Sequence, residues 1–385
     1  MMRWLAELER EAASRARAGL ARRAVPRRPD DQLVDLAGND YLGLARHPEV
    51  VAAAAGALQA YGLGATASRL VRGSTAAHEA LEHALAGWVG AGTALVYSSG
   101  YLANLGALAA VGRAGGVLVS DAHNHASLID GCRLARAATV VTPHRDVDAV
   151  AAALATAAGR PAVVVTESVF SVDGDLAPLR ELHAVARSHG ALLLVDDVHA
   201  LGLLGPGGAG GVAAAGLAGE PDVVVTATLS KALGAAGGFV AGPAALRRHL
   251  VDTSRTFIFD TGLPPAVAAG AAAAVRLARA GDDRRAELRD RARTATGKLR
   301  AAGLEVTDPA GGVLSVTAPD AAAATGWAAA CRERGVAVGC FRPPSTPDQR
   351  SRLRLTINAG LHRADFDRAL DVIVATAPST GRGGP

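Results

Sequence analysis

Five short apolar runs, each followed by polar or ionisable residues, limit most strongly how this chain can fold. They span residues 95–97, 117–120, 162–166, 191–195 and 223–226, and segments with helical periodicity separate them. Continuous apolar runs of this length are typical of strands in a parallel sheet that helices cover on both faces. Ligands of such sheets bind beyond the carboxyl ends of the strands. The sequence therefore predicts an α/β fold with a polar site at that edge.

The residues that follow two of these runs can hold and use a phosphorylated cofactor. Lys231 follows the fifth run, where desolvation can leave a lysine neutral enough to form a Schiff base. The hydroxyl groups of Thr228 and Ser230, next to it in the chain, can bind a phosphate. Gly100 and Tyr101 open a predicted helix after the first run, and the free N–H groups at a helix N-terminus also bind phosphate.

Three further side chains at the strand ends suit an aromatic ring. Asp196 can keep a pyridinium nitrogen protonated, which makes the ring an electron sink. His199 follows three residues later and can hydrogen-bond a ring phenolate, while His125 can stack on the ring face. A lone lysine in a turn or a lone half-buried histidine is usually structural, and His123 is assigned only a structural role. In combination with Lys231, however, the set predicts a site for pyridoxal 5′-phosphate (PLP).

Composition excludes several other classes of protein. The formal net charge is +4 over 385 residues, without blocks of like charge, so we expect no nucleic-acid partner. Serines and glycines interrupt the uncharged run 84–112, which predicts a strand-turn-helix and no membrane span. The three cysteines lack metal-ligand spacing, so we expect no metal and a reducing, cytoplasmic location. Residues 1–23 predict a helix lying on the body of the protein, and their acidic residues argue against a targeting segment.

The chain is expected to divide into three parts. Residues 1–45 would form an N-terminal helix and a segment of a small domain, and residues 46–275 would form the large cofactor-binding domain. After residue 275 the pattern changes to an Arg-rich helical stretch followed by short strands and helices. Residues 276–385 therefore predict a smaller α+β domain.

Segments along nearly the whole chain resemble the α-oxoamine synthases, PLP-dependent enzymes of fold type I. Each segment is a weak signal alone, but their order and spacing are specific: they are residues 39–44, 99–101, 125–128, 170–174, 196–202, 228–231 and 352–356. The resemblance implies a large domain with a mostly parallel seven-stranded sheet covered by helices. It also implies a smaller α+β domain, built from the C-terminal part and the N-terminal segment, and a homodimer with shared active sites.

The family's residue roles carry over at the matching positions. The catalytic residues would be Lys231, which forms the Schiff base and moves protons, together with His125, Asp196 and His199. The remaining cofactor contacts would come from Gly100, Tyr101, Ser171, Thr228 and Ser230, with Thr261 reaching the phosphate of the partner subunit. Asn39 and Arg354 would receive the carboxylate of an amino-acid substrate.

The resemblance implies a decarboxylative condensation of an acyl-CoA with an amino acid. Residues 341–345, Phe-Arg-Pro-Pro-Ser, are most similar to members that join pimeloyl-CoA, or another pimeloyl thioester, to L-alanine in biotin biosynthesis. The products would be 8-amino-7-oxononanoate, CoA and CO2. Arg342 and Ser345 would bind substrate, and Arg22 or Arg23 would hold the distal carboxylate by charge-assisted hydrogen bonds.

Two other readings stay open at this point. A related synthase could use glycine or serine with another acyl-CoA. A non-catalytic partner subunit of such a synthase is the other, but it would be expected to lack the reactive lysine, and Lys231 is present.

Overall fold

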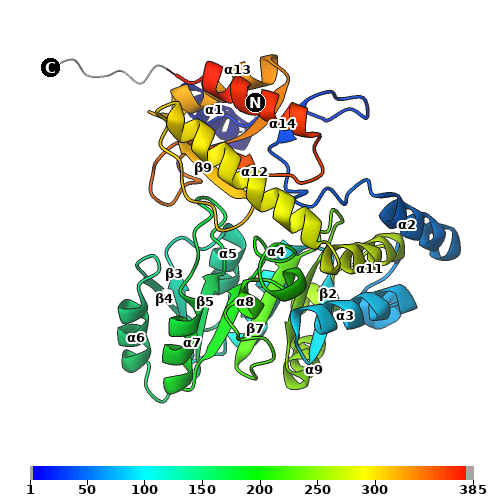
Figure 1. The fold of residues 1–385 in the computed structure, drawn as a ribbon. Helices are drawn as coiled ribbons and strands as arrows, with labels where there is room; N and C mark the ends of the chain where they lie inside the picture. The colour runs from blue at the N-terminus through cyan, green and yellow to red at the C-terminus, as the bar shows by residue number, and fades with distance from the viewer. Residues whose placement is uncertain (1–2, 379–385) are drawn as a thin grey trace.

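A seven-stranded sheet forms the centre of the large domain in the computed structural model, which describes residues 3–378 (Figure 1). The strand order is β2-β8-β7-β6-β5-β3-β4, and only β8 runs against its neighbours. This confirms the predicted mostly parallel sheet. The strands are β2 (Thr93–Tyr97), β3 (Val117–Asp121), β4 (Ala138–Thr142), β5 (Ala162–Glu167), β6 (Leu192–Asp196), β7 (Val223–Thr228) and β8 (Gly238–Gly242).

Helices cover both faces of this sheet because the central strands bury side chains on both sides. Val163 and Val165 pack into one core cluster with α4 and α5, whereas Val164 points to the other face, toward α6 and α7. The helices of this domain are α2 (Pro48–Tyr61), α3 (Ala76–Val89), α4 (Gly100–Val111), α5 (Ala126–Leu134), α6 (Val147–Thr156), α7 (Leu179–Ser188), α8 (Gly211–Ala214), α9 (Ala244–Thr253), α10 (Arg255–Ile258) and α11 (Pro265–Arg279).

A four-stranded sheet of order β1-β10-β11-β9 forms the smaller α+β domain. Its edge strand β1 comes from the N-terminal segment and pairs in parallel with β10, while β10, β11 and β9 are antiparallel. The strands are β1 (Val34–Leu36), β9 (Val313–Thr317), β10 (Val336–Phe341) and β11 (Arg352–Thr356), and the helices are α12 (Asp282–Ala301), α13 (Ala321–Glu333) and α14 (Arg363–Ala375).

The division into domains at residues 45 and 275 stays a prediction. Helix α11 continues past residue 275 to Arg279 and packs against α2 and α3 of the large domain, and α12 begins at Asp282. Residues 1–2 and 379–385, which the expected outer domains include, lie outside the described residues.

The N-terminal helix forms, but it does not bury an apolar face on its own subunit. Helix α1 (Arg3–Arg17) has no buried residue, and Trp4 is 66 % exposed. The expectation that this helix lies on the body of the protein is therefore wrong for the single chain. Within residues 3–378, the helices all fall short of the length and apolar character needed to cross a membrane.

Candidate active site

A cavity of about 330 Å³ lies at the carboxyl ends of the central strands, as the pattern of apolar runs predicted. The ends of β5, β6 and β7 and the start of α4 supply its walls. Most of the predicted cofactor residues line it, namely Gly100, Tyr101, His125, Asp196, His199, Thr228, Ser230 and Lys231. Ser171 and Thr261 do not line this cavity, and their places are described below.

Lys231 is held at one side of the cavity by a short chain of buried polar groups. Its Nζ lies 3.1 Å from Nε2 of His199, whose Nδ1 lies 2.6 Å from the hydroxyl of Tyr41. Desolvation, with help from the charge of Arg354, lowers the pKa of Lys231 to about 8. Burial and the neighbouring cations also hold the pKa of His199 well below its usual value, so its imidazole is neutral.

Asp196 stands at the end of β6 with its carboxylate fixed on both oxygens. Its Oδ2 accepts a hydrogen bond of 2.7 Å from Asn104 on α4, and its Oδ1 accepts one of 3.1 Å from the backbone N–H of Val198. Asn104 also donates to Ser127, so helices α4 and α5 are tied to the strand end. The sequence analysis did not identify Asn104 or Ser127, because each lies on a helix where polar residues are common.

Glu167 is a second carboxyl group that the sequence analysis left without a role. It pairs in register with Asp196 across β5 and β6, and it is fully surrounded by protein. Burial and the nearby charge of Asp196 raise its pKa well above the usual value. Its two oxygens accept hydrogen bonds from the backbone N–H groups of His125, at 2.7 Å, and Ser171, at 3.1 Å. Glu167 therefore fixes the two loops that border the cavity.

His125 caps α5 and presents its ring to the cavity. Its Nδ1 lies 2.8 Å from the hydroxyl of Ser127 and also accepts the backbone N–H of that residue at 3.2 Å. Burial by surrounding protein, together with the charges of Lys231 and Arg354, lowers the pKa of His125 and favours the neutral ring. A neutral ring fixed through one nitrogen can lie flat against an aromatic group.

The opposite end of the cavity is built from hydroxyl groups and a helix N-terminus. Ser99 caps α4 by accepting the N–H of Leu102 at 3.1 Å, and the hydroxyls of Thr228 and Ser230 lie 2.8 Å apart. A Cβ on Gly100 would lie 2.8 Å from Cβ of Thr228, so only glycine lets the helix start this close to β7. This end offers the donors and the dipole that bind a phosphate.

Arg354 joins the N-terminal segment to the small domain beside the cavity. From β11 it donates to the side chain of Asn39 at 3.1 Å and to the backbone carbonyl of Ser171 at 2.7 Å, and its guanidinium lies over the ring of Phe341. Asn39 also accepts the hydroxyl of Tyr41 at 3.3 Å. The structure thus brings the two predicted carboxylate-binding residues together, next to Ser171.

A second cavity, of about 590 Å³, adjoins the first at His125 and is also lined by Ser171. Arg22 and Ser345 also line it, and Arg22 donates to the hydroxyl of Ser345 at 3.0 Å. A guanidinium and a hydroxyl from residues more than three hundred positions apart therefore lie together in the wall of this cavity. Val172 lines the same cavity.

Besides Asn39 and Arg354, three more predicted site residues lie outside both cavities. Arg342 hydrogen-bonds Thr325 and donates to the backbone carbonyl of Ala21 at 3.2 Å, so it holds the segment that carries Arg22. Arg23 is exposed and lines neither cavity. Thr261 is exposed and bridges to Ser68 in the same chain. Direct roles for these residues stay predictions.

The polar groups that line the first cavity fit PLP. The hydroxyls of Thr228 and Ser230 and the N-terminus of α4 can bind its phosphate. Asp196 can bind its ring nitrogen, and Lys231 lies within the same cavity. The neutral imidazole of His199 suits the phenolic oxygen. This part of the molecule is therefore a candidate PLP site.

The model of the family described as aminotransferase class I and II matches residues 31–373. An 8-amino-7-oxononanoate synthase of Mycolicibacterium smegmatis is 54 % identical over 97 % of each chain, and one of Mycobacterium avium is 52 % identical over 98 % of this chain and 97 % of the other. The chain therefore belongs to the aminotransferase class I and II family of PLP-dependent enzymes, and within it to the 8-amino-7-oxononanoate synthase group.

Solved structures agree with this assignment. Serine palmitoyltransferase from S. paucimobilis, with a PLP adduct bound, is similar with a TM-score of 0.90 and 31 % identity over 96 % of each chain. The 8-amino-7-oxononanoate synthase of Francisella tularensis has a TM-score of 0.76 and 25 % identity, over 90 % of this chain and 98 % of that one. Both confirm the α/β class and the PLP-enzyme fold predicted from the sequence.

Proposed function

We propose that this enzyme condenses pimeloyl-CoA, or another pimeloyl thioester, with L-alanine to give 8-amino-7-oxononanoate, CoA and CO2. The observation that carries the proposal is the pair of adjoining cavities. One holds a desolvated lysine and a fixed carboxylate, and the other is lined by a cation, Arg22, suited to a distal carboxylate. The identity of more than half of all positions with 8-amino-7-oxononanoate synthases supports the same reaction.

The first cavity would hold PLP through the residues that line it. Gly100, Thr228 and Ser230 would bind the phosphate, Asp196 the ring nitrogen and His199 the phenolic oxygen. When bound, PLP supplies a carbonyl group that takes up the substrate amine and a ring that stabilises negative charge on the adjacent carbon. The protein's own contribution is binding, orientation and proton transfer.

Lys231 would carry the proton transfers. With a pKa of about 8 it is partly neutral near pH 7.5, so it can accept the Cα proton of alanine. His199, neutral and anchored to Tyr41, keeps the lysine amine at a fixed place. Over the whole reaction a bond forms between Cα and the acyl carbonyl carbon, CoA leaves as the thiol, the carboxylate leaves as CO2, and Cα regains one proton.

Arg354 and Asn39 would receive the carboxylate of alanine. The guanidinium is buried and oriented by Ser171 and Phe341, so its free donors face a defined direction. Because the carboxylate is the group that leaves as CO2, its orientation relative to the cofactor ring matters for the decarboxylation step.

Arg22 and Ser345 would bind the distal carboxylate of the pimeloyl group. A guanidinium and a hydroxyl that lie 3.0 Å apart in the wall of the second cavity form a suitable pair of donors. Of the two arginines that the sequence left open, the contact with Ser345 favours Arg22. Arg342 would act indirectly, by holding the backbone carbonyl of Ala21.

The likeness in shape to serine palmitoyltransferase raises a second candidate, a synthase that uses serine or glycine with a fatty acyl-CoA. Arg22, the cation that lines the second cavity, disfavours this candidate. An alkyl chain would offer its guanidinium no partner and would leave it partly desolvated.

We further infer that the enzyme is a cytoplasmic homodimer with shared active sites. Exposed apolar side chains gather on α2 and the segment that follows it, including Tyr61 at 45 %, Leu63 at 84 % and Val71 at 81 % exposure. Phe259 beside Thr261 is 68 % exposed. A partner subunit on this face would cover the apolar surface and could receive Thr261 at its phosphate end. The free cysteines are in keeping with a reducing compartment.

The test is product analysis with competing amino acids. Purified protein with PLP is incubated with pimeloyl-CoA and equal amounts of alanine, glycine and serine, and the products are identified by mass spectrometry. A single 8-amino-7-oxononanoate product supports both substrates. A glycine or serine adduct would overturn the choice of amino acid, and no product from pimeloyl-CoA, with product from palmitoyl-CoA in a parallel reaction, would overturn the acyl group.

A further inference from the structure

A group of two histidines and two aspartates lies beside the second cavity and has no part in the chemistry described so far. His144 is held between two carboxylates, with its Nδ1 2.9 Å from Asp121 and its Nε2 2.9 Å from Asp175. Burial alone would lower the pKa of His144, but the two hydrogen bonds outweigh it and raise the pKa to about 9. The ring of His144 is therefore a cation with both N–H groups occupied.

His123 stacks flat on this cation. The ring centroids lie 3.8 Å apart with an angle of 12° between the planes, and the backbone N–H of His123 donates to Asp121 at 2.7 Å. A single carboxylate thus fixes both the backbone of His123 and the ring that supports it. Partial burial and the charge of His144 lower the pKa of His123, so its own ring is neutral.

The outer face of His123 belongs to the wall of the second cavity. The ring is half-buried, and its two nitrogens have no hydrogen-bond partner among residues 3–378. Arg22 and His125 line the same cavity. The structure has therefore built a rigid, neutral ring, with one N–H donor and one acceptor nitrogen, into the space that the acyl-CoA would occupy.

The charge state of this ring decides what kind of group it suits. A charged imidazole would favour a carboxylate or phosphate, and Arg22 already supplies a cation in the wall of this cavity. A neutral imidazole suits an uncharged carbonyl or amide group. Pimeloyl-CoA has such groups between its distal carboxylate and its nucleotide, in the thioester and in the amides of the pantetheine arm.

We propose that His123 is an acyl-CoA-binding residue, which hydrogen-bonds an uncharged carbonyl oxygen of the substrate, and that His144 with Asp121 and Asp175 positions it. This inference rests on the proposed function, because it assigns the second cavity to the acyl-CoA. It gives a role to a histidine that the sequence analysis treated as structural.

The experiment compares His123→Leu and His123→Gln with the wild-type holoenzyme. The leucine variant keeps the bulk but loses the hydrogen bond, and we expect the KM for pimeloyl-CoA to rise about 5- to 10-fold. The KM for alanine and the visible absorbance of bound PLP should not change. Glutamine retains an N–H donor and should recover most of the loss. His189→Gln, at an exposed site on the end of α7, is the matched control.

Binding without turnover gives a second readout. Pimeloyl-CoA is titrated into the holoenzyme in the absence of alanine, and calorimetry should report the same 5- to 10-fold weakening for His123→Leu. A His144→Asn variant, which keeps His123 but removes the supporting cation, should weaken binding in the same direction.

Unchanged KM and unchanged binding in His123→Leu would overturn the inference. So would a variant that loses PLP absorbance and alanine affinity together with acyl-CoA affinity, since that pattern means a structural role. If the wild-type enzyme itself forms no product from pimeloyl-CoA, the proposed function fails first. If the wild type is active and the His123 variants keep its affinity for pimeloyl-CoA, only the role of His123 is wrong.

Discussion

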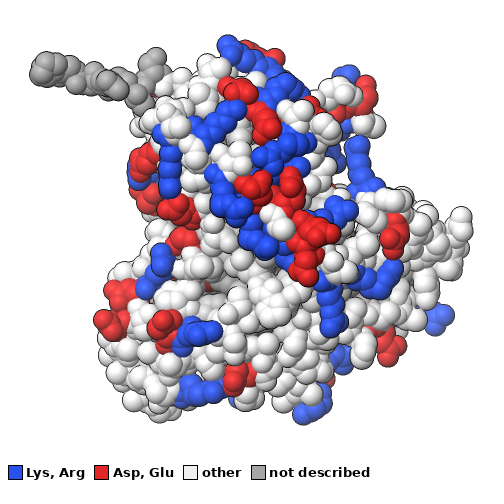
Figure 2. Space-filling view, viewed as in Figure 1, with Lys and Arg blue, Asp and Glu red and all other residues white. Residues whose placement is uncertain are grey.

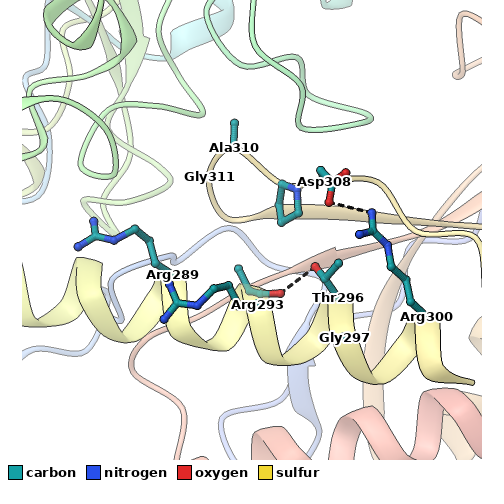
Figure 3. Close-up of a pocket in the computed structure, with 10 residues that line it drawn as sticks. Arg289, Arg293, Thr296, Gly297, Arg300, Asp308, Ala310 and Gly311 are labelled. Carbon is teal, nitrogen blue, oxygen red and sulfur yellow. Dashed lines mark hydrogen bonds and ion pairs between the residues drawn. The ribbon is translucent and has the colours of Figure 1, made fainter.

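Two of the cavities that contain ionisable side chains differ: one has the features of an active site and the other does not. The first cavity, of about 330 Å³, is the candidate PLP site and is called the cofactor cavity below. It surrounds Lys231 and Asp196 with protein. Another cavity, of about 500 Å³, lies between α12 and the loop before β9 and is lined by Arg289, Arg293 and Arg300 (Figure 3). It is the larger of the two, but none of the predicted site residues line it.

The difference lies in solvation. In the arginine-lined cavity, Arg300 pairs with Asp308 at 2.8 Å, and these side chains are 46 % and 85 % exposed. Charged side chains gather over this part of the surface (Figure 2). Exposed pairs of this kind keep their water and contribute about 0 to 1 kcal/mol. In the cofactor cavity the same kinds of charge lose water, which lowers the pKa of Lys231 to about 8. The desolvation of ionisable side chains therefore identifies the active site better than the volume of the cavity does.

The largest expected effect comes from removing the desolvated lysine. Lys231→Ala should reduce kcat about 10⁴-fold, because it removes the group that moves the Cα proton. Steady-state kinetics and the absorbance of bound PLP measure the loss. Arg293→Ala in the other cavity is the control and should keep wild-type kcat. Equal losses in both variants would break the comparison between the two cavities.

The next effect concerns Arg22, the cation that lines the second cavity. Arg22→Ala should raise the KM for pimeloyl-CoA about 10- to 100-fold, because a charge-assisted hydrogen bond to the distal carboxylate is lost. The neighbouring Arg23→Ala should change it less than twofold. Steady-state kinetics with pimeloyl-CoA as the varied substrate measure both KM values. A larger rise in KM for Arg23→Ala than for Arg22→Ala would assign the role to Arg23.

The lowered pKa of Lys231 predicts how PLP uptake depends on pH. Only the neutral amine reacts with the carbonyl group of PLP, and its fraction rises with pH up to the pKa of about 8. The rate of PLP uptake by the apoprotein should therefore increase about tenfold per unit below pH 8 and become level above it. Stopped-flow absorbance measures the rate. A rise that continues to pH 10 would mean that the lysine is not desolvated.

The smallest effect is expected in the arginine-lined cavity. Asp308→Ala removes the partner of Arg300, and because the pair is exposed the free energy of unfolding should fall by less than about 1 kcal/mol. Urea denaturation measures the change. A loss of several kcal/mol, or a change in kcat, would show that this cavity is coupled to the active site.

The sequence predicted the sheet edge and the residues of the cofactor cavity, because apolar runs and their polar ends are local signals. It did not predict the partners that depend on register or on helix packing. Glu167 matters because β5 and β6 align it with Asp196, and Asn104 matters because α4 turns it toward the same carboxylate. Glu167 also follows an apolar run directly, and this position was a signal that could have predicted it as a site residue.

Two strands of the large sheet were not among the apolar runs that predicted it. Strand β4 is an edge strand with mostly exposed residues, and β8 begins and ends with glycine. The exposed face of α1 was mispredicted for a related reason. Amphipathic periodicity indicates that a helix has an apolar side, but it does not indicate which surface covers that side.

The pairing of β1 with β10 has a consequence for how the chain is made. Val34 and Val336 are register partners, so the small sheet joins residues from opposite ends of the polypeptide. During synthesis the first 45 residues leave the ribosome long before their partner strands exist, while the large domain between them can already fold. The segment that carries Arg22 and Asn39 therefore reaches its place last. Assembly of the residues proposed to bind substrate depends on synthesis of the small domain.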